Sequence, residues 1–462
     1  MSNSVLIVGG GVAGLEAATQ CANAGARAVV VEHGAVVGGK LAAAMTDQSS
    51  AGDHYGGVPI PKLDALVEQD NIEVMTLAHL ESISGQAGDF SVTIRERARF
   101  VTDTCTRCNR CRAVCPVVVP NEFDAGLTYR KAIYTPLAQT FPNEYVINIH
   151  DCLNAPPNYL PCTRCIDVCD DDSIHFDMPL SQSHEKQVAA IIITVGYEIA
   201  DDTKLAELGY GLHPDVVTSA ELRRLLEAPG PTGGFVSKPS NEEYPRSILL
   251  VLDKLSAFSA NVAASQIHRL ADQDIDKISL LILVQPKADT RFDALEALAT
   301  EAGIDVCWGM MPQIEAAPDN VLAVTYEDFS SNRLTKREYD MVALCSDVQP
   351  SSGLNELAQT VEIDLDGNGY IAATQIDGAG ICTSRPGIYV AGCASGPKNV
   401  KDSIAEARTA ANRALSEMDP RLLQPGYRSG KVTGENGQDL SETALRNQIE
   451  RMLNALINQG DK

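Results

Sequence analysis

The N-terminal part of the chain combines short apolar runs with one stretch of helical spacing. Ser4–Val8 is a mainly apolar run, which predicts a buried strand. Leu15, Ala18 and Cys21 then recur at helical spacing, and Ala28–Val31 is a second apolar run. Because buried strands joined by a helix run parallel, this order predicts a strand–helix–strand unit in a parallel sheet.

The same pattern returns later in the chain. A second strand–helix–strand unit is predicted at Ser247–Leu252, Ala257–Leu270 and Ile278–Val284. Further elements are predicted as apolar strands at Val188–Thr194, at Tyr339–Cys345 and from Ile388, and as a helix rich in alanine at Val400–Leu415. Two such units predict an α/β protein with two sheets.

The last stretch of the chain is predicted to be a polar segment followed by an amphipathic helix. Gln424–Gln438 is polar and rich in glycine, which is typical of a flexible tether. Six apolar residues then follow at helical spacing, namely Leu445, Ile449, Met452, Leu453, Leu456 and Ile457. This face either packs on its own domain or docks on a partner subunit.

Length, charge and cysteine content restrict the class of protein. A chain of 462 residues divides into about two to four domains. The net charge of −24 argues against nucleic acid and against an anionic bilayer. The longest apolar runs fall far short of the roughly 20 residues of a membrane-spanning helix. The 13 cysteines, with no targeting segment ahead of the first strand, predict a cytoplasmic protein that reaches the inner face of a membrane only through partner subunits.

A glycine-rich turn follows the first strand and predicts a dinucleotide site. Gly9, Gly11 and Gly14 form G-x-G-x-x-G, in which two glycines let the backbone approach a pyrophosphate and the third lets helix and strand pack closely. Glu32 ends the second strand, where a carboxylate can accept hydrogen bonds from a ribose. The run Gly38–Gly39–Lys40 adds a glycine pair of the kind found in FAD-binding flavoproteins, so it favours FAD over NAD.

Two later segments complete the predicted flavin site. Gly196 follows an apolar strand, as in flavoproteins where the chain returns from the first FAD lobe. Gly392 ends a final strand, and Cys393 stands where such flavoproteins commonly place an aspartate for the ribityl chain. Lys398 precedes a helix that starts at Val400, whose N-terminus is expected to face the flavin C2 oxygen.

Eight cysteines fall into two sets with ferredoxin-like spacing. The first set follows C-x2-C-x2-C-x3-C-P, the bacterial ferredoxin run that binds [4Fe–4S] clusters, and consists of Cys105, Cys108, Cys111 and Cys115. The second set, spaced C-x9-C-x2-C-x3-C, consists of Cys152, Cys162, Cys165 and Cys169. If the halves cross over as in two-cluster ferredoxins, Cys169 joins the first three cysteines and Cys115 joins the other three. Structural zinc and disulfides are the alternatives, and neither is typical of this spacing in the cytosol.

The second strand–helix–strand unit lacks the glycines that a nucleotide site needs. Its turn, Leu252–Ala260, contains no glycine, and Asp253 would repel a phosphate. We therefore expect no direct oxidation of NAD(P)H, while a self-sufficient NAD(P)H-dependent reductase and a scaffold with a redox-silent flavin are the alternatives. The histidines are scattered, so no catalytic residue is predicted.

The predicted fold is α/β: a thioredoxin-reductase-like flavoprotein with two dinucleotide-binding domains and an inserted ferredoxin-like domain for two [4Fe–4S] clusters. The predicted regions are the first FAD lobe (1–100), the insertion (101–180), the continued lobe and a linker (181–235), the second unit (236–350), the last part of the FAD lobe (351–420) and the tether with its helix (421–462).

The chain resembles the A subunit of heterodisulfide reductase, and more closely the A subunit of the quinone-interacting membrane-bound oxidoreductase. The resemblance covers roughly residues 4–417 and is most specific at Cys115–Asp124, Arg130–Tyr134 and Gly392–Pro397. It implies an FAD protein that passes electrons between partner subunits in quinone-linked or disulfide-linked metabolism. The donor, the acceptor, the direction of flow and a homodimer within the larger complex are left open.

Overall fold

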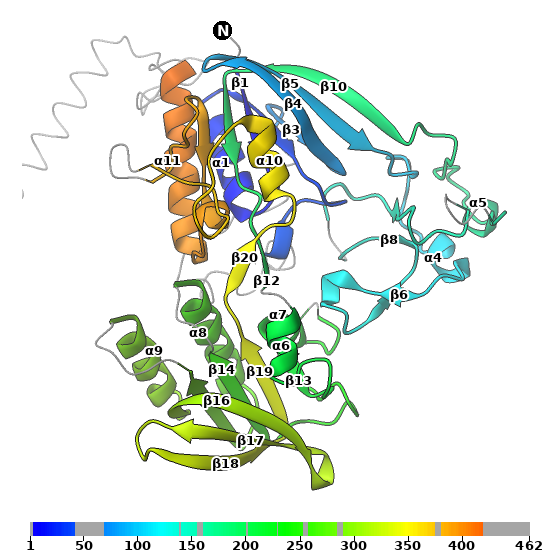
Figure 1. The fold of residues 1–462 in the computed structure, drawn as a ribbon. Coiled ribbons are helices and arrows are strands. Elements are labelled where there is room, and N and C mark those ends of the chain that lie inside the picture. The colour runs from blue at the N-terminus through cyan, green and yellow to red at the C-terminus, as the bar shows by residue number, and fades with distance from the viewer. Residues whose placement is uncertain are drawn as a thin grey trace, which may run out of the picture.

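Two α/β units and a cysteine-rich part make up the structure. The computed structural model describes residues 3–41, 69–137, 140–154, 160–199, 202–228, 230–252, 257–283, 290–374 and 380–418. Figure 1 shows the two units one above the other, with the cysteine-rich part beside them. The tether and amphipathic helix predicted from Gln424 onwards lie outside the described residues.

A five-stranded parallel sheet forms the centre of the first unit. Its order is β21-β11-β1-β2-β3, and every neighbouring pair is parallel. The strands are β1 Ser4–Val8, β2 Arg27–Val31, β3 Ile72–Met75, β11 Ala190–Ile193 and β21 Ile388–Val390. They come from three distant parts of the sequence, so the chain leaves this sheet twice and returns to it.

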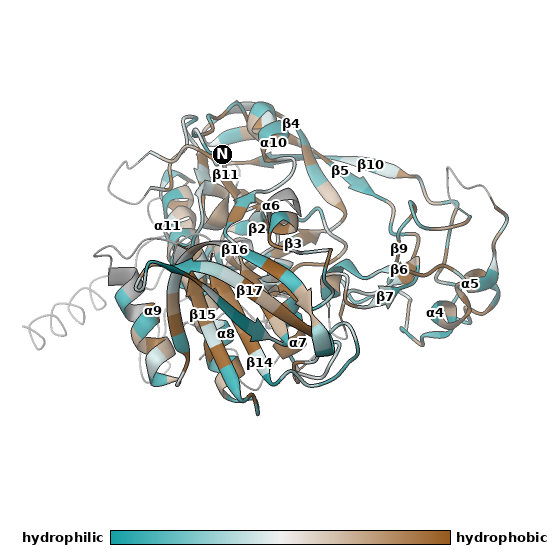
Figure 2. Cartoon of the chain, turned by 60° about the horizontal axis from the view of Figure 1, so that its bottom comes forward, coloured by the Kyte–Doolittle hydropathy of each residue, from teal (hydrophilic) through white to brown (hydrophobic). Residues whose placement is uncertain are grey.

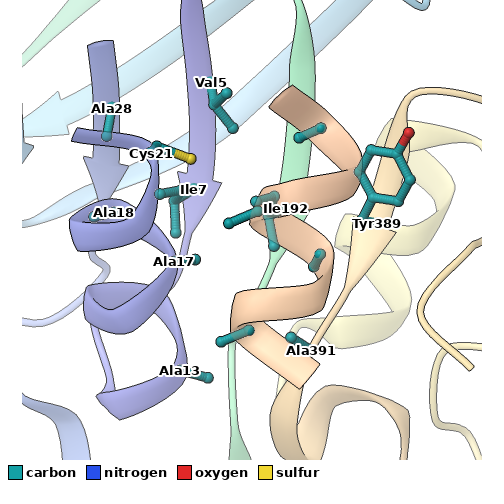
Figure 3. Close-up of a cluster of buried hydrophobic side chains, with 14 of the residues drawn as sticks. Val5, Ile7, Ala13, Ala17, Ala18, Cys21, Ala28, Ile192, Tyr389 and Ala391 are labelled. Atoms are coloured by element: carbon teal, nitrogen blue, oxygen red, sulfur yellow. The ribbon is translucent and has the colours of Figure 1, made fainter. Parts of the chain in front are cut away.

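Helices α1 Val12–Asn23 and α11 Val400–Met418 pack side by side on one face of this sheet. Small residues allow the close approach: Figure 3 shows Ala13 and Ala17 on the side of α1 that faces α11, with Ile192 of β11 between the helices. The other face carries helix α10 Leu354–Val361 and an antiparallel sheet. The strands of that sheet are β4 Ala78–Gln86, β5 Asp89–Arg97 and β10 Ser181–Val188.

The second unit is built on a seven-stranded mixed sheet of order β13-β19-β14-β15-β16-β17-β18. The pairs from β13 to β16 are parallel, and β16, β17 and β18 form an antiparallel meander. Figure 2 shows hydrophobic residues along β14 and β15 at its centre. The elements are β13 Val216–Thr218, β14 Ser247–Leu252, β15 Lys277–Ile282, β16 Asp305–Ala317, β17 Val321–Asp328, β18 Arg333–Tyr339, β19 Met341–Cys345, α7 Ser219–Leu226, α8 Ala257–Ala271 and α9 Thr290–Glu301.

The segment 181–235, expected in the first unit, is divided between the two. Strands β10 and β11 lie in the first unit, but β13 pairs with β19 in the second sheet and α7 packs in the same apolar core. The strand β13 is too short to give a sequence signal of its own. The connection between the units is a pair of antiparallel strands, β12 Tyr197–Ile199 and β20 Val348–Pro350, and the chain forms α6 Asp202–Glu207 after β12.

A cysteine-rich insertion lies between β5 and β10, and a bridge between Val101 and Ile174 closes it near its ends. Its apolar core is small: Phe100, Ile133, Tyr145 and a few neighbours pack around Cys111 and Cys165. A core of this size is typical of small domains stabilised by bound metal groups. The elements are α4 Arg110–Val114, α5 Arg164–Asp167, β6 Val119–Pro120, β7 Tyr129–Arg130, β8 Ile133–Tyr134, β9 Val146–Ile147 and the 3-10 helix η3 Glu122–Asp124.

In the described part of the chain, the other 3-10 helices are η1 Gly39–Leu41, η4 Pro318–Asn320 and η6 Gly392–Ser395. Over the described residues, no helix combines the length and the apolar character needed to cross a membrane.

Candidate functional site

The first and third glycines of the predicted fingerprint are required by packing. Gly9 has φ +110°, and a Cβ there would lie 2.5 Å from the carbonyl oxygen of Thr194. A Cβ on Gly14 would lie 1.9 Å from the carbonyl oxygen of Gly9. The hydroxyl of Thr194 donates to that same carbonyl at 2.8 Å. The turn, helix α1 and strand β11 are therefore locked together, as close helix–strand packing demands.

Gly11 faces open space instead. A Cβ on Gly11 would meet no atom within 4 Å, and it caps α1 without a side-chain hydrogen bond. The second glycine pair closes over it: the Gly38 amide donates to Gly10 at 2.8 Å, and a Cβ on Gly39 would lie 3.1 Å from the Gly11 Cα. The amides at a helix N-terminus beside an open glycine are suited to a pyrophosphate.

Glu32 holds this loop in shape. Its two carboxylate oxygens accept hydrogen bonds from the amides of Gly10, at 2.7 Å, and Gly34, at 2.6 Å. Burial raises the pKa of Glu32, while the same amides favour the charged form and oppose that rise. A carboxylate has about four acceptor positions, so oxygen lone pairs remain for ribose hydroxyls.

Gly392 and Cys393 come close to the start of α1. Gly392 has φ +69°, and a Cβ there would lie 3.2 Å from the Cβ of Ala13. The Cys393 thiol lies 3.4 Å from the carbonyl oxygen of Lys398, and burial raises its pKa. Gly196 has φ +79° and, like Gly11, open space on its Cβ side. Gly392 and the glycine loop therefore meet at the N-terminus of α1, and Cys393 follows Gly392 in the chain.

Glu406 was not predicted from the sequence, although it organises the start of α11. Its carboxylate accepts from the Gly392 amide at 3.0 Å and lies 3.5 Å from the Lys398 ammonium. Lys398 also donates to Ser395 at 2.8 Å, just ahead of the helix start at Val400. Only the chain reversal between Gly392 and α11 brings these groups together, and sequence spacing carries no such signal.

Lys40 lies at the junction of the two units. Its ammonium is 5.4 Å from the centre of the Tyr197 ring, and that ring packs edge-on against Phe258 of α8 at 4.8 Å. Burial lowers the pKa of Lys40, and Arg223 of α7 lowers it further. The lysine thus contacts the connection to the second unit, whereas Gly38 and Gly39 contact the glycine loop.

The eight cysteines of the insertion line two separate cavities of similar size. One, of about 340 Å³ including open solvent, is lined by Cys115, Cys152, Cys162 and Cys165. The other, of about 310 Å³, is lined by Cys105, Cys108, Cys111 and Cys169. Ile133 lines both and separates them. This is the crossed division considered from the spacing, with the last cysteine of each set contributing to the other set's cavity.

The cysteines that line the cavities differ in exposure. Cys108 is exposed, and hydrogen bonds from Arg110 lower its pKa. Burial raises the pKa of Cys111 to about 11 and that of Cys165 to about 12, so burial favours the neutral thiols, and a bound cation such as iron would favour the thiolates. Within the described ranges, no three histidine, cysteine or carboxylate side chains are placed to bind one metal ion together. The other cysteines of the chain line neither cavity, and Cys307 and Cys345 are buried in the second unit.

The insertion is fixed to the loop of the first unit that follows Glu32. Half-buried Arg99 donates to the Ala35 carbonyl and, at 2.8 Å, to the hydroxyl of Thr76. The Val37 amide donates to the Phe141 carbonyl at 2.9 Å. Ala35 also packs with Tyr134 and Val146 of the insertion. The cysteine cavities and the glycine loop therefore belong to parts of the chain that touch.

Comparison with known proteins identifies the class. Residues 4–125 match the family model described as FAD dependent oxidoreductase, a range that contains the glycine fingerprint, Glu32 and the second glycine pair. Together with the parallel sheet and its glycine loop, this match defines the chain as an FAD-dependent oxidoreductase.

More specifically, the chain is a homologue of the A subunit of heterodisulfide reductase at about 30% identity. The A subunit of the H(2):CoB-CoM heterodisulfide,ferredoxin reductase of Methanothermobacter thermautotrophicus is 30% identical over 432 residues, which are 90% of this chain and 64% of that protein. The iron-sulfur A subunit of the CoB--CoM heterodisulfide reductase of Methanocaldococcus jannaschii is 31% identical over 428 residues, 89% of this chain and 64% of that protein. The chain thus spans less than two thirds of the length of these relatives.

Among solved structures, two thioredoxin reductases align over 90% of this chain at 14% identity. The enzyme of T. acidophilum gives a TM-score of 0.46 and that of Lactococcus lactis one of 0.48. The assignment of the fold rests on the strand order and the two sheets described above.

Proposed function

We propose that this chain is an electron-transfer subunit of a multisubunit oxidoreductase and holds one FAD and two [4Fe–4S] clusters. The observation that carries the proposal is the division of eight cysteines into two cavities with four cysteines each. Four thiolates are the usual ligand set of one cube. The fit is also chemical, because each cavity has apolar walls and cysteine as its only soft ligand.

The residues of the first unit fit FAD. Gly11 leaves room for the pyrophosphate at the N-terminus of α1, and Glu32 accepts from the adenosine ribose. The N-terminus of α11 at Val400 offers its partial positive charge to the flavin ring, and Lys398, paired with Glu406, lies just ahead of it. When bound, FAD exchanges electrons in pairs or singly and each cluster exchanges one, so the set converts between the two modes.

Partner subunits supply and remove the electrons in this proposal. The relatives are named as subunits of CoB–CoM heterodisulfide reductases, and one name includes ferredoxin. For this chain we infer the same type of role, in a complex linked to a disulfide or to the quinone pool on the cytoplasmic side. The stretches Arg130–Tyr134 and Gly392–Pro397 are among the most specific parts of the resemblance to the A subunits of these two kinds of complex.

The test is anaerobic isolation of the native complex, with identification of its subunits and analysis of the cofactors. We expect about eight irons and about eight acid-labile sulfides per chain, as two cubes require, with one non-covalent FAD and no FMN. A fully loaded chain with only four irons would remove the second cluster. A chain purified without partners that turns over substrate by itself would contradict the subunit role.

A further inference from the structure

Helix α7 of the second unit reaches the insertion through one buried arginine. Arg224 is only 3% exposed. Its Nε and Nη2 atoms donate to the same oxygen of Asp124, at 3.2 and 2.9 Å. Its Nη1 atom pairs with Glu227, the residue that follows its own helix. A buried arginine is stable only when such carboxylates compensate it, so this contact is strongly coupled.

Asp124 is held in place to receive it. Its second oxygen accepts from the Asn121 side-chain amide at 2.7 Å and from the Thr128 hydroxyl at 2.5 Å. The backbone closes the same loop, because the Asn121 backbone amide donates to the Thr128 carbonyl at 2.8 Å. Both oxygens of the carboxylate are therefore used, one within the insertion and one across to α7.

An apolar contact supports the polar one. Leu127, three residues beyond the end of the 3-10 helix η3, packs against the buried core of the second unit, which includes Leu222 and Leu225 of α7. Figure 1 shows the β6 region of the insertion next to α7. A side chain of the insertion thus contributes to a core of the second unit, independently of the ion pair.

Glu122, at the start of η3, is linked to the cysteines by ion pairs. Glu122 accepts from Arg130 at 2.5 and 2.8 Å, and Arg130 also donates to Asp151 at 3.0 Å. Asp151 directly precedes Cys152, which lines one of the two cavities. Glu122 and Asp124 therefore connect the Cys152 side of that cavity to helix α7 through ion pairs with Arg130 and Arg224.

We propose that the second unit holds the iron–sulfur insertion in position and that Arg224 is the positioning residue of this contact. The proposal rests on the proposed function only in assigning clusters to the cavities. It gives a role to an α/β unit whose turn carries no glycine for a nucleotide. Fixing η3 holds the Cys152 cavity at a constant place relative to the loop around Ala35, which the insertion contacts from its other side.

Hydrogen exchange of the purified protein tests directly whether the second unit holds the insertion in position. In an Arg224→Gln variant the amides of segment 121–130 should exchange roughly a hundredfold faster or more, because removing one partner of a buried ion pair frees the segment to open. Asp124→Asn should raise exchange less, since Glu227 still compensates Arg224.

The matched control is Arg337→Gln, which removes an ion pair with Asp305 inside the second unit and far from the insertion in sequence. Exchange of segment 121–130 should stay at the level of the unaltered protein in this variant. A second readout is the electron paramagnetic resonance signal of the cluster assigned to the Cys152 cavity. This signal should broaden in Arg224→Gln while the flavin content stays constant.

Unchanged exchange of segment 121–130 in both Arg224→Gln and Asp124→Asn would refute the proposal that the second unit positions the insertion, whatever the cofactor content. Equal acceleration in Arg337→Gln would also overturn it, because the effect would then be general destabilisation. If Arg224→Gln does not fold, Asp124→Asn still decides the question from the insertion side. A protein that carries no iron would instead refute the proposed function and leave the exchange result intact as a test of the contact.

Discussion

Arg110 forms an ion pair with Asp170, the residue directly after Cys169. Arg110 lies between Cys108 and Cys111, so the pair joins the loop of the first cysteines to the last cysteine of the second set. The hydrogen bond from Arg110 lowers the pKa of the Asp170 carboxyl. In the ferredoxin run a proline follows the fourth cysteine. After Cys169 this exposed ion pair stands where the proline would be, and Cys169 lines the cavity that also contains Cys105, Cys108 and Cys111.

The crossed arrangement predicts which cysteine variants share a phenotype. Cys169→Ala should alter the same electron paramagnetic resonance signal as Cys105→Ala, because both side chains line one cavity. Cys307→Ala and Cys345→Ala should leave both signals and the iron content unchanged, since these residues are buried in the second unit. Spectra of the four variants after anaerobic reduction are compared.

The cavity lined by Cys115, Cys152, Cys162 and Cys165 gives a matching test. Cys115→Ala should alter the signal affected by Cys162→Ala and leave that of Cys105→Ala intact. If Cys169→Ala instead behaves like Cys162→Ala, each set binds its own cluster and the crossed assignment fails.

The α/β class and most elements of the two sheets were predictable from the sequence. The predicted strand Ser247–Leu252 has those bounds in the structure, and the predicted start of α11 at Val400 is also correct. These elements carry strong local signals, because a buried strand is continuously apolar and an amphipathic helix is periodic. The glycine fingerprint likewise reports a local turn, so the packing of Gly14 on Gly9 follows from nearby residues, whereas the contact of Gly9 with Thr194 does not.

Contacts between distant segments could not be predicted. Arg224 and Asp124 are 100 residues apart, and nothing in either local pattern marks them as partners. Glu406 likewise acquires its role from the reversal that brings α11 beside Gly392. The placement of β13 in the second sheet follows the same rule, since a three-residue strand is defined by its neighbours. Such features are fixed by tertiary packing, which single-sequence patterns do not encode.

Gly11 is the position where a side chain should block FAD without disturbing the fold. A Gly11→Leu variant should keep its iron and lose the yellow flavin absorbance, because the new side chain would point into the open space beside the N-terminus of α1. Gly367→Leu is the matched control, since Gly367 is exposed and also has open space on its Cβ side. Visible spectra and iron content report the outcome. Full flavin content in folded Gly11→Leu would contradict the site.

Glu32→Ala should weaken FAD binding and loosen the loop at the same time. The amides of Gly10 and Gly34 would lose the carboxylate that accepts their hydrogen bonds. The ribose hydroxyls of FAD would lose the same acceptor. A hydrogen bond to a charged group contributes about 1.5–3 kcal/mol, so the Kd for FAD should rise roughly tenfold to a hundredfold. Fluorescence titration of flavin-free protein measures this constant. Glu73→Ala, which removes a surface partner of Arg27 and Lys186, should leave it unchanged.

NADH and NADPH should not reduce the isolated chain at a useful rate. Strand β14 ends at Leu252 and α8 begins at Ala257, and no residue from Leu252 to Ala260 is a glycine. A pyrophosphate needs the close backbone approach that glycine permits at this turn. Asp253 adds a negative charge there, in a chain whose net charge is already −24. Electrons should therefore enter through a partner subunit.

Anaerobic stopped-flow mixing with each nicotinamide decides this point, with flavin absorbance as the signal. We expect no bleaching within the turnover time of the complex, and bleaching when a partner that co-purifies with the chain is present. Dithionite provides the control, because it should reduce the flavin in the same sample and show that the cofactor is competent. Rapid bleaching by NADH with the isolated chain would favour the self-sufficient reductase, and the second unit would then bind a nucleotide by a route that does not use glycines.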